Sequence, residues 1–368
     1  MVTADGARAQ AAYAALERYF GVGHGLYHET HPLARDSRYA HAWPHTQALA
    51  ATLDLFGIGA VHVKALRRCL RGLDWYWDGR PAIGLRGYES SVRWPLGHGG
   101  DKYHDDNAWA GLNLVRAHRM TGDAPALERA RQVFALLVAG WEDTPSGVAP
   151  AGGVYWKQQK PGEANHDRNT VSTAPSAELG LRLYALTRDA TDLEWARRMC
   201  DWVEAHLRAP DDLLYWDHLT RDDAGTETVE RTKWSYNQGT MLGAYVLLAQ
   251  ATGDPAGAYS RRAAAVAQAS LRHFDGRQAT QGAAFNAIWF RNLLLLHVNA
   301  RHDPALQSAI EQALRAYADW AWDSVRDPVT DLFNVKGGDA PAMVIDQAAM
   351  VQVFACLAWP PDAYDRLV

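Results

Sequence analysis

The sequence predicts an all-α protein, an (α/α)6 barrel of about twelve helices in an inner and an outer ring. Three observations lead to this prediction. Apolar residues recur at helical spacing in about twelve segments, the segments alternate between two burial patterns, and a similar short turn joins several of them. A closed ring can use this length as one folding unit, so we expect a single domain over residues 1–368.

The helical segments are separated by Gly, Pro and Asp, which end helices and form turns. Strand signals are few and lie in the connections. We expect helices near residues 5–20, 42–57, 60–76, 105–121, 124–141, 173–188, 191–208, 235–252, 255–273, 284–299, 303–322 and 341–358.

The segments alternate in character along the chain. Even-numbered segments, such as GTMLGAYVLLA and AFNAIWFRNLLLL, are apolar, small or aromatic almost all round, as a helix buried on every side should be. Odd-numbered segments, such as LERARQVF, carry a charged face. An inner ring of six and an outer ring of six satisfy both patterns, and an open superhelical solenoid is the alternative.

Similar turns join several pairs of segments: MTGDAPALERA, TRDATDLEWA, ATGDPAGAYS and ARHDPALQSA. Each combines a helix C-cap with an Asp or Thr N-cap and a helix-starting residue. This recurrence is an internal repeat of helix, turn and helix, with a period of roughly 50 to 70 residues.

The composition favours a large core and a neutral ligand. Hydrophobic residues make up 48% of the chain and charged residues 21%, which excludes a disordered protein. The formal net charge of −5 argues against a nucleic-acid partner, which needs clustered Lys and Arg. Trp and Tyr, at 15 each, outnumber the 8 Phe, and aromatics with a polar edge suit the faces of sugars as well as packing between helices.

The cysteines and the N-terminal segment indicate the compartment. Cys69, Cys200 and Cys356 are far apart and odd in number, so neither a disulfide framework nor a CxxC metal site follows. The first residues lack a basic stretch followed by an apolar one, and no apolar run reaches the roughly 18 residues of a membrane span. We expect a cytoplasmic monomer, or a secreted one if a signal peptide preceded this numbering.

Four long connections lead from outer to inner helices, near residues 77–104, 142–172, 209–234 and 323–340. Loops of such length are uncommon unless they are functional. They contain the strand-like stretches GLRGYESSVRW, GGVYWKQQ, LLYWDHL and DLFNVKGG, and we expect them to gather at one end of the barrel. The starts of the inner helices supply polar and aromatic clusters at that end: HAWPHTQ, YHDDNAW, STAPSAE, KWSYNQG, AFNAIWFRN and MVIDQAA.

Asp105 and Asp106 are the adjacent carboxylates at an inner-helix start. Cleavage of a glycosidic bond uses two carboxyl groups, and an Asp pair before a helix is otherwise a cap. Because a leading residue can take non-helical angles, the two carboxyls could straddle a sugar at roughly the 5–5.5 Å of retaining enzymes. Like-charge repulsion should raise one pKa, while the helix end favours the other group as an anion.

The same clusters supply further candidates for binding substrate. Tyr236, Asn237 and Gln238 could bond sugar hydroxyls or cap a helix. Asn286, Arg291 and Asp346 could orient the Asp pair, with a structural salt bridge as the alternative for Arg291. Four aromatic candidates could stack on sugars or pack in the core: Trp43, Tyr155, Trp156 and Trp234. Two further candidates from the same clusters are His45 and Tyr103.

Four segments of the chain resemble glycoside hydrolase family 76, the α-1,6-mannanases. YHDDNAWAGLNLVRAHRMTGD is similar to the Asp-Asp signature of that family, and GGVYWKQQ to its Gly-Gly-aromatic hairpin. STAPSAELGLRLYALT is similar to its third inner helix, and SYNQGTMLGAYVLLAQATGD to its Tyr-Asn-Gln-Gly helix. Together the segments cover about residues 105–255, in the order expected for the family.

The resemblance implies an (α/α)6 fold and retaining hydrolysis of α-1,6-mannosidic bonds in mannan or manno-oligosaccharides, without a metal or another cofactor. In the family the first Asp of the pair is the nucleophile and the second is the acid/base, which implies these roles for Asp105 and Asp106. The sequence departs from the family at Thr173 and Ala177, where Asn is more usual. This departure concerns the substrate subsites.

Three other interpretations stay open. His41 and His45, four residues apart, could bind zinc together with His104. A sugar epimerase or isomerase on the same barrel would use paired histidines for proton transfer. A catalytically inactive carbohydrate-binding barrel would have the same fold, because fold does not determine function.

Overall fold

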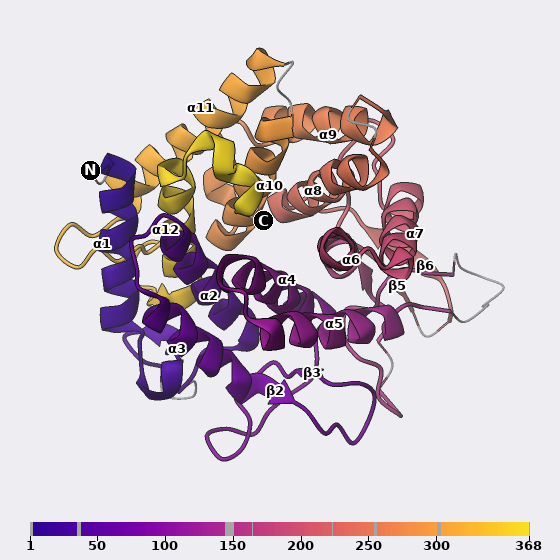
Figure 1. The fold of residues 1–368 in the computed structure, drawn as a ribbon, viewed down its shortest axis with the longest axis horizontal. Helices are drawn as coiled ribbons and strands as arrows, with labels where there is room; N and C mark the ends of the chain where they lie inside the picture. The colour runs from indigo at the N-terminus through magenta and orange to yellow at the C-terminus, as the bar shows by residue number, and fades with distance from the viewer. Residues whose placement is uncertain are drawn as a thin grey trace. The chain divides into compact units, whose positions relative to one another are not determined.

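A computed structural model gives the structure of residues 3–34, 38–143, 151–163, 165–222, 224–253, 256–299 and 303–367. The chain divides into two compact units, and the single domain expected from the sequence stays a prediction. The first unit comprises Met1–Trp77, Glu89–Gly100 and Phe274–Val368, and the second comprises Asp78–Tyr88 and Asp101–His273. Figure 1 labels their helices and strands.

In the first unit the three buried helices are neighbours. Helix α12 packs against both α10 and α2, while α1, α3 and α11 cover them from outside. The bounds of these helices are α1 Ala4–Tyr19, α2 Ala42–Gly57, α3 Val63–Leu73, α10 Ala283–Asn299, α11 Pro304–Trp320 and α12 Val344–Ala358.

The second unit repeats this arrangement. Helix α6 packs against both α4 and α8, with α5 on α4 and α7 on α6. The bounds are α4 His104–Thr121, α5 Ala124–Ala139, α6 Thr170–Thr187, α7 Ala190–His206, α8 Ser235–Thr252 and α9 Ala258–Phe274.

All twelve predicted helices are present, and the predicted alternation in burial is confirmed. Every residue of α8 from Ser235 to Ala249 is buried, which matches its apolar sequence. Helix α5 instead buries a stripe at Ala126, Ala130, Val133 and Leu137, the spacing of one helix face. The period of the apolar residues therefore distinguishes the central helices from the covering ones.

Three of the four repeated turns end their helices in the left-handed conformation typical of a C-cap, and the cap in ARHDPALQSA lies outside the described residues. Gly122 ends α4 at φ 73° and Gly253 ends α8 at φ 67°. In the corresponding turn after α6 this conformation is taken by Arg188, at φ 61°, although a side chain disfavours it. Asp189 then caps α7 by accepting the Thr191 N–H at 3.0 Å.

The strands are short and lie in the connections. In the first unit β1 (Thr30–His31) pairs antiparallel with β7 (Ala342–Met343). In the second unit β4 (Arg168–Asn169), β5 (His218–Arg221) and β6 (Glu227–Glu230) form an antiparallel sheet in that order. The remaining short elements are β2 Trp77–Asp78, β3 Gly87–Tyr88, η1 Gly23–Gly25, η2 Asp74–Tyr76, η3 Gln278–Thr280, η4 Ala321–Val325 and η5 Pro361–Arg366.

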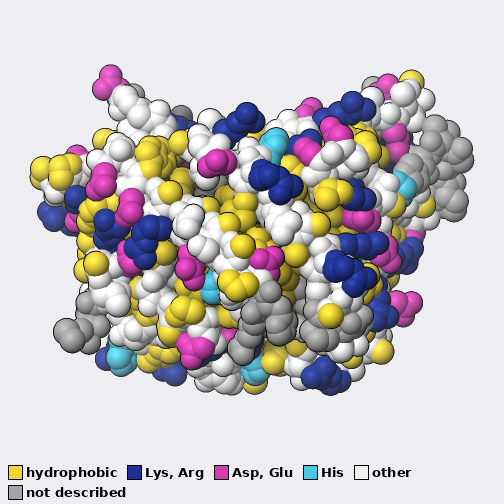
Figure 2. All heavy atoms as spheres, turned by 90° about the horizontal axis from the view of Figure 1, so that it is seen from above, with side chains coloured by type: hydrophobic (Ala, Val, Ile, Leu, Met, Phe, Trp, Pro, Cys, Tyr) yellow, Lys and Arg dark blue, Asp and Glu magenta, His cyan; other side chains and the backbone are white. Residues whose placement is uncertain are grey.

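Surface and core agree with the composition. Figure 2 shows Lys and Arg interspersed with Asp and Glu over the face in view, which fits an uncharged ligand better than a polyanion. Cys69, Cys200 and Cys356 are buried free thiols. In the part of the chain that the structure describes, no helix has the length and apolar character needed to cross a membrane.

Candidate active site

Asp105 and Asp106 occupy the first turn of α4 in the second unit. The helix begins at His104, and the extended residue before it is Tyr103, at φ −85° and ψ 134°. The prediction that the leading Asp takes non-helical angles is therefore wrong, because Tyr103 takes them instead. Both residues lie in the first turn, at the positive end of the helix, and the Asp106 N–H donates to Asp105 Oδ1 at 3.0 Å.

The start of α4 is fixed by His104 against the Tyr155–Trp156 segment. The His104 N–H donates to the Trp156 carbonyl at 2.8 Å, and Nδ1 lies 2.7 Å from the Tyr155 carbonyl. A carbonyl only accepts, so Nδ1 carries the proton. Burial lowers the pKa of His104 to about 4, so the ring stays neutral. His104 therefore serves to position its neighbours.

Asn107 fixes the helix start from another side. Its Nδ2 donates to the carbonyls of Tyr88 at 2.9 Å and Tyr103 at 2.7 Å, and its Oδ1 accepts the Tyr88 N–H at 2.7 Å. The side chain is fully buried. With backbone partners on both sides, the first turn of α4 is a rigid support for the two carboxyls.

Asp105 lies beside two aromatic rings. Trp156 Nε1 donates to Asp105 Oδ2 at 3.3 Å, and the Trp156 ring lies 4.8 Å from the ring of Tyr103, centroid to centroid. Trp156 is 37% exposed, so it can offer a face to a ligand. The predicted places of Tyr103 and Trp156 beside the Asp pair are thus consistent with the structure.

The pKa values of the two carboxyls are raised. Burial, with the negative charge of Asp217 adding to it, raises the pKa of Asp105 to about 7, against the hydrogen bonds from Asp106 and Trp156. Burial and then the charge of Asp105 raise the pKa of Asp106 well above the usual range. In the described part of the chain no cation is among the main charges that act on the pair, so one proton is retained near neutral pH, preferentially on Asp106.

Asp217 is a third carboxylate of this site that sequence reasoning missed. It directly precedes β5, and its charge acts on both Asp105 and Tyr236. His218 Nδ1 lies 3.1 Å from Asp217 Oδ2, a contact that raises the pKa of His218. Asp217 could have been found from its place in LLYWDHL, one of the strand-like stretches expected to gather at one end of the barrel.

Of the three residues Tyr236, Asn237 and Gln238 at the start of α8, the first two border the carboxylates and the third holds a loop. Burial, with the charges of Asp217 and Asp105, keeps the pKa of Tyr236 well above its usual range, so its phenol remains a donor at this site. Asn237 is fully buried, with Nδ2 3.5 Å from Asp217 Oδ1. These two side chains therefore border the carboxylates.

Gln238 holds the neighbouring loop instead of facing a ligand. It is fully buried, its Oε1 accepts the Tyr215 N–H at 2.8 Å, and its Nε2 donates to the carbonyls of Tyr215 at 2.9 Å and Trp234 at 3.0 Å. Its place in the predicted substrate contacts is corrected to a positioning role. Trp234 is the partly exposed residue preceding α8.

Tyr155 also departs from its predicted place. The main charges that act on its phenol are those of Glu142, Arg168, Arg221 and Glu227. Neighbouring residues of an extended segment point to opposite sides, so Trp156 faces Asp105 while Tyr155 faces away. Its backbone carbonyl supports His104, and a contact of its side chain with substrate stays a prediction.

Two predicted contacts on α2 lie in the first unit. His45 is fully buried between the rings of Tyr27 and Tyr76, its Nε2 is 3.1 Å from the Cys69 carbonyl, and burial lowers its pKa to about 4. It is a core histidine, which corrects its place among the substrate contacts. Trp43 is partly exposed and stacks on Phe285 at 5.8 Å.

Arg291 is a structural residue. Its guanidinium donates to Asp54 at 2.8 and 2.6 Å, to Gln352 Oε1 at 2.8 Å and to the Leu367 carbonyl. Of the two roles open in the sequence, the salt bridge is confirmed and orientation of the Asp pair is wrong, because these partners engage the guanidinium.

The other two candidates of the first unit differ in exposure. Asn286 is fully buried and donates to the Gln278 carbonyl at 2.8 Å, so it also acts within the core. Asp346 lies in the first turn of α12 and keeps some exposed surface. Burial raises its pKa to about 6, partly offset by Lys336.

The structure describes the surroundings of the three histidines considered as zinc ligands. Within the described ranges, no group of three or more His, Cys, Asp or Glu side chains is arranged to hold a metal ion. His41 is exposed and lies 3.4 Å from Glu29, while His45 and His104 are buried and neutral. Because burial keeps the His45 and His104 rings neutral at pH 7, neither ring is suited to proton transfer there.

Comparison with known proteins identifies the family. The sequence model of glycosyl hydrolase family 76 matches residues 87–355. The chain belongs to glycosyl hydrolase family 76. Its curated relatives include the mannan endo-1,6-α-mannosidases of Candida glabrata and Saccharomyces cerevisiae, each 27% identical over 168 residues. The matches cover 44% of this chain and 36% of each relative, so the chain aligns with about a third of their length.

Solved family 76 structures show the same fold. A mannosidase from Bacteroides thetaiotaomicron has a TM-score of 0.82 at 22% identity, covering 97% of this chain and 98% of that one. An inactive variant of an α-1,6-mannanase from Salegentibacter, in complex with α-1,6-mannotriose, has a TM-score of 0.79 at 21% identity, covering 96% and 99%. The fold is therefore the predicted (α/α)6 barrel, and the open solenoid is excluded.

Proposed function

We propose that this member of family 76 is a retaining glycoside hydrolase that cleaves α-1,6-mannosidic linkages in mannan-type polysaccharides or oligosaccharides. The observation that carries the proposal is the Asp105–Asp106 pair, two carboxyls with raised pKa values beside the exposed ring of Trp156. The relatives named as mannan endo-1,6-α-mannosidases support the linkage. The inactive mannanase variant that binds mannotriose has two consecutive aspartates replaced by asparagine, which supports the pair.

Asp105 is suited to attack the anomeric carbon. The Asp106 N–H bonds its Oδ1 and the Trp156 indole bonds its Oδ2, so the carboxylate is oriented before substrate arrives. Both bonds also favour the anion. In the first step an Asp105 oxygen forms a bond to the anomeric carbon as the bond to the bridging oxygen breaks.

Asp106 is suited to exchange the proton. Its raised pKa keeps it protonated in the free protein, so it can transfer that proton to the bridging oxygen as the linkage breaks. Esterification of Asp105 removes the negative charge that raises the pKa of Asp106. The Asp106 carboxylate can then take a proton from the water that attacks the anomeric carbon and releases Asp105.

The groups around the pair suit a neutral sugar. Trp156 and Tyr103 offer aromatic surface, and Tyr236 and Asp217 supply a donor and an acceptor for hydroxyl groups. The negative charges of Asp105 and Asp217 at one site would stabilise a glycosyl cation in the transition state and repel an anionic substrate.

The test is hydrolysis of α-1,6-mannotetraose, followed by NMR for the anomeric configuration of the first product. We expect α product at early times, with activity lost in both D105N and D106N. Asp211→Asn is a matched control because Asp211 belongs to another adjacent pair, Asp211–Asp212, and is exposed. β product, epimerisation of the sugar, or full activity in either active-site variant would contradict the proposal.

A further inference from the structure

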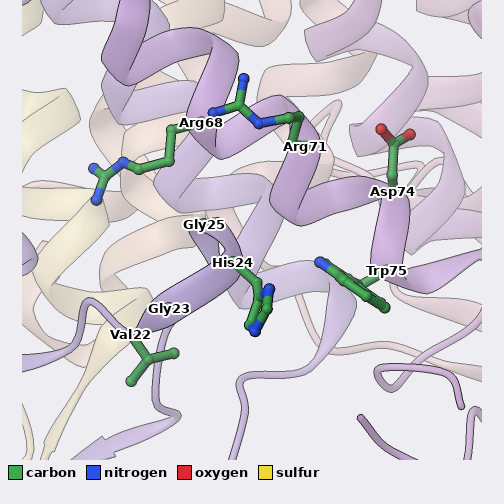
Figure 3. A pocket seen from close by; sticks show the side chains of 8 residues that line it. All are labelled: Val22, Gly23, His24, Gly25, Arg68, Arg71, Asp74 and Trp75. Carbon is green, nitrogen blue, oxygen red and sulfur yellow. The ribbon is translucent and has the colours of Figure 1, made fainter. Parts of the chain in front are cut away.

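The first unit contains a pocket whose residues have no role in the proposed hydrolysis. Its volume is about 740 Å³, within the roughly 300–1,000 Å³ of small-molecule sites. The wall consists of the turn after α1, the last part of α3 and the start of η2 (Figure 3). The lining residues are Val22, Gly23, His24, Gly25, Arg68, Arg71, Asp74 and Trp75.

The turn and the helix that form the pocket pack backbone against backbone. A Cβ atom on Gly25 would lie 2.1 Å from the Arg68 carbonyl oxygen, and one on Gly72 would lie 2.1 Å from the Gly25 carbonyl oxygen. Gly25 has a φ of 78°, and His24 before it has a φ of 66°. This close approach fixes His24 beside α3, so the pocket is formed before a ligand arrives.

The helix at this pocket is strongly basic although the whole chain has a net charge of −5. Helix α3 carries Lys64, Arg67, Arg68 and Arg71 and has no acidic residue. The Arg68 guanidinium is held by Glu17, whereas Arg71 is exposed and pairs with no acidic side chain in the described parts of the chain. An exposed guanidinium in a concave site binds phosphate oxygens well.

Two aromatic rings also line this pocket. The ring centroids of His24 and Trp75 are 5.5 Å apart, with their planes at 78°. Figure 3 shows both rings below the helix that carries Arg71. An indole can pack against the C–H face of a pyranose, and an imidazole can hydrogen-bond a hydroxyl group. Asp74, three residues after Arg71, is the acidic member of the lining and can accept from another hydroxyl.

We propose that this pocket binds a phosphorylated hexose, with the phosphate on Arg71 and the sugar ring against Trp75. The cation and the indole account for the two halves of such a ligand, and the pocket volume accommodates both. The site is independent of hydrolysis at Asp105, because it contains none of the residues given a role there.

The test is isothermal titration of the intact protein with mannose 6-phosphate, mannose and inorganic phosphate. We expect mannose 6-phosphate to bind at least about tenfold more tightly than either fragment. Arg71→Gln should weaken that binding by at least about tenfold, and Asp74→Asn should strengthen it by removing a like charge. Arg67→Gln is the matched control, because Arg67 is exposed on the same helix but does not line the pocket.

Four results would overturn the proposal: no binding, equal affinity for mannose and mannose 6-phosphate, equal loss in R71Q and R67Q, or tighter binding of a nucleoside monophosphate. An equal loss of affinity in R71Q and R67Q would mean that the ligand is attracted by the positive charge of the whole helix and not bound at the pocket. The D106N protein should bind mannose 6-phosphate normally, and R71Q should hydrolyse α-1,6-mannotetraose normally. These two measurements separate a failure of this proposal from a failure of the proposed hydrolysis.

Discussion

Two carboxylates on buried helices of this protein have opposite surroundings. Asp54 on α2 is fully buried and meets the guanidinium of Arg291 with two short hydrogen bonds. Asp105 on α4 has no ion pair with a cation among the described residues, and the charges that act on this site are those of the carboxylates of Asp105, Asp106 and Asp217. The first carboxylate has a compensated charge and holds two helices together, whereas the second is destabilised as an anion.

This difference separates a structural acid from a reactive one. A buried carboxylate with a bidentate arginine is already satisfied and has little tendency to bond a substrate. Carboxylates that face one another share protons and gain stability when one of them is protonated or esterified. The raised pKa values are therefore part of the proposed chemistry, and the following variants test the contrast.

The largest effect is expected from D105N and D106N. Each removes one of the two groups that the cleavage needs, so kcat should fall by about 10²–10⁴-fold or more. Circular dichroism should show an unchanged fold, because neither carboxyl forms an ion pair among the described residues that the substitution would break. Loss of the fold in both variants, with no soluble protein, would place the pair on the structural side of the comparison.

Arg291→Met should have the reverse signature. It leaves the Asp54 carboxylate buried without its partner, which costs about 3–5 kcal/mol of unfolding free energy. Urea unfolding measures this loss, and the double variant Asp54→Leu with Arg291→Met should regain much of it. If R291M unfolds at the same urea concentration as the parent protein, the ion pair does not stabilise the fold.

The difference in unfolding free energy between D106N and the parent protein should depend on pH. Folding raises the pKa of Asp106 in the parent protein, so its native state binds more protons than its unfolded state. The parent protein therefore loses stability as pH rises. Below the unfolded pKa of about 4 the parent and D106N should be equally stable. At neutral pH D106N should be the more stable, as judged by urea unfolding. If D106N is less stable than the parent protein at neutral pH, the expected direction of the stability change is wrong.

Asp217→Asn tests the third carboxylate through the pH profile. Removing its negative charge should lower the pKa of Asp105, so that the acidic limb of kcat/KM moves to lower pH. His218→Gln is a useful companion because it removes the cation that can neutralise Asp217. An acidic limb that stays in place in D217N would mean that Asp217 does not act on the nucleophile.

The smallest effect is expected from Trp156→Phe. The substitution keeps an aromatic face but removes the indole N–H that bonds Asp105 at 3.3 Å. Loss of one hydrogen bond to a charged group should lower kcat about tenfold, while KM changes little. Tyr155→Phe is the control on the other side of the same segment and should leave both constants unchanged. Equal effects in both variants would contradict the assigned orientations.

The helices were predictable because their burial follows from local periodicity. An apolar stripe on α5 and an apolar surface all round α8 are visible in the letters themselves. The Asp pair was found for a similar reason, since two adjacent carboxylates at the start of a predicted inner helix can be recognised from the sequence. Its precise backbone geometry was missed, because only the structure shows that Tyr103 is the residue before the helix.

The errors concern polar residues whose role depends on a distant partner. His45, Gln238 and Arg291 lie on buried helices, where a polar side chain can face a cavity or bond a neighbouring backbone or acid. The sequence alone does not distinguish these two environments. Asp217 was missed for the converse reason, because a loop carboxylate becomes part of the site only through the fold.

The central claim is that Asp105 forms a bond to the sugar. It is tested most directly by trapping the intermediate with a fluorinated α-mannosyl fluoride and locating the label by mass spectrometry of proteolytic peptides. We expect one mannosyl adduct on Asp105, formed in the parent protein and absent from D105N. Turnover of α-1,6-mannotetraose to a β product, with no adduct or with the label on another residue, would contradict it.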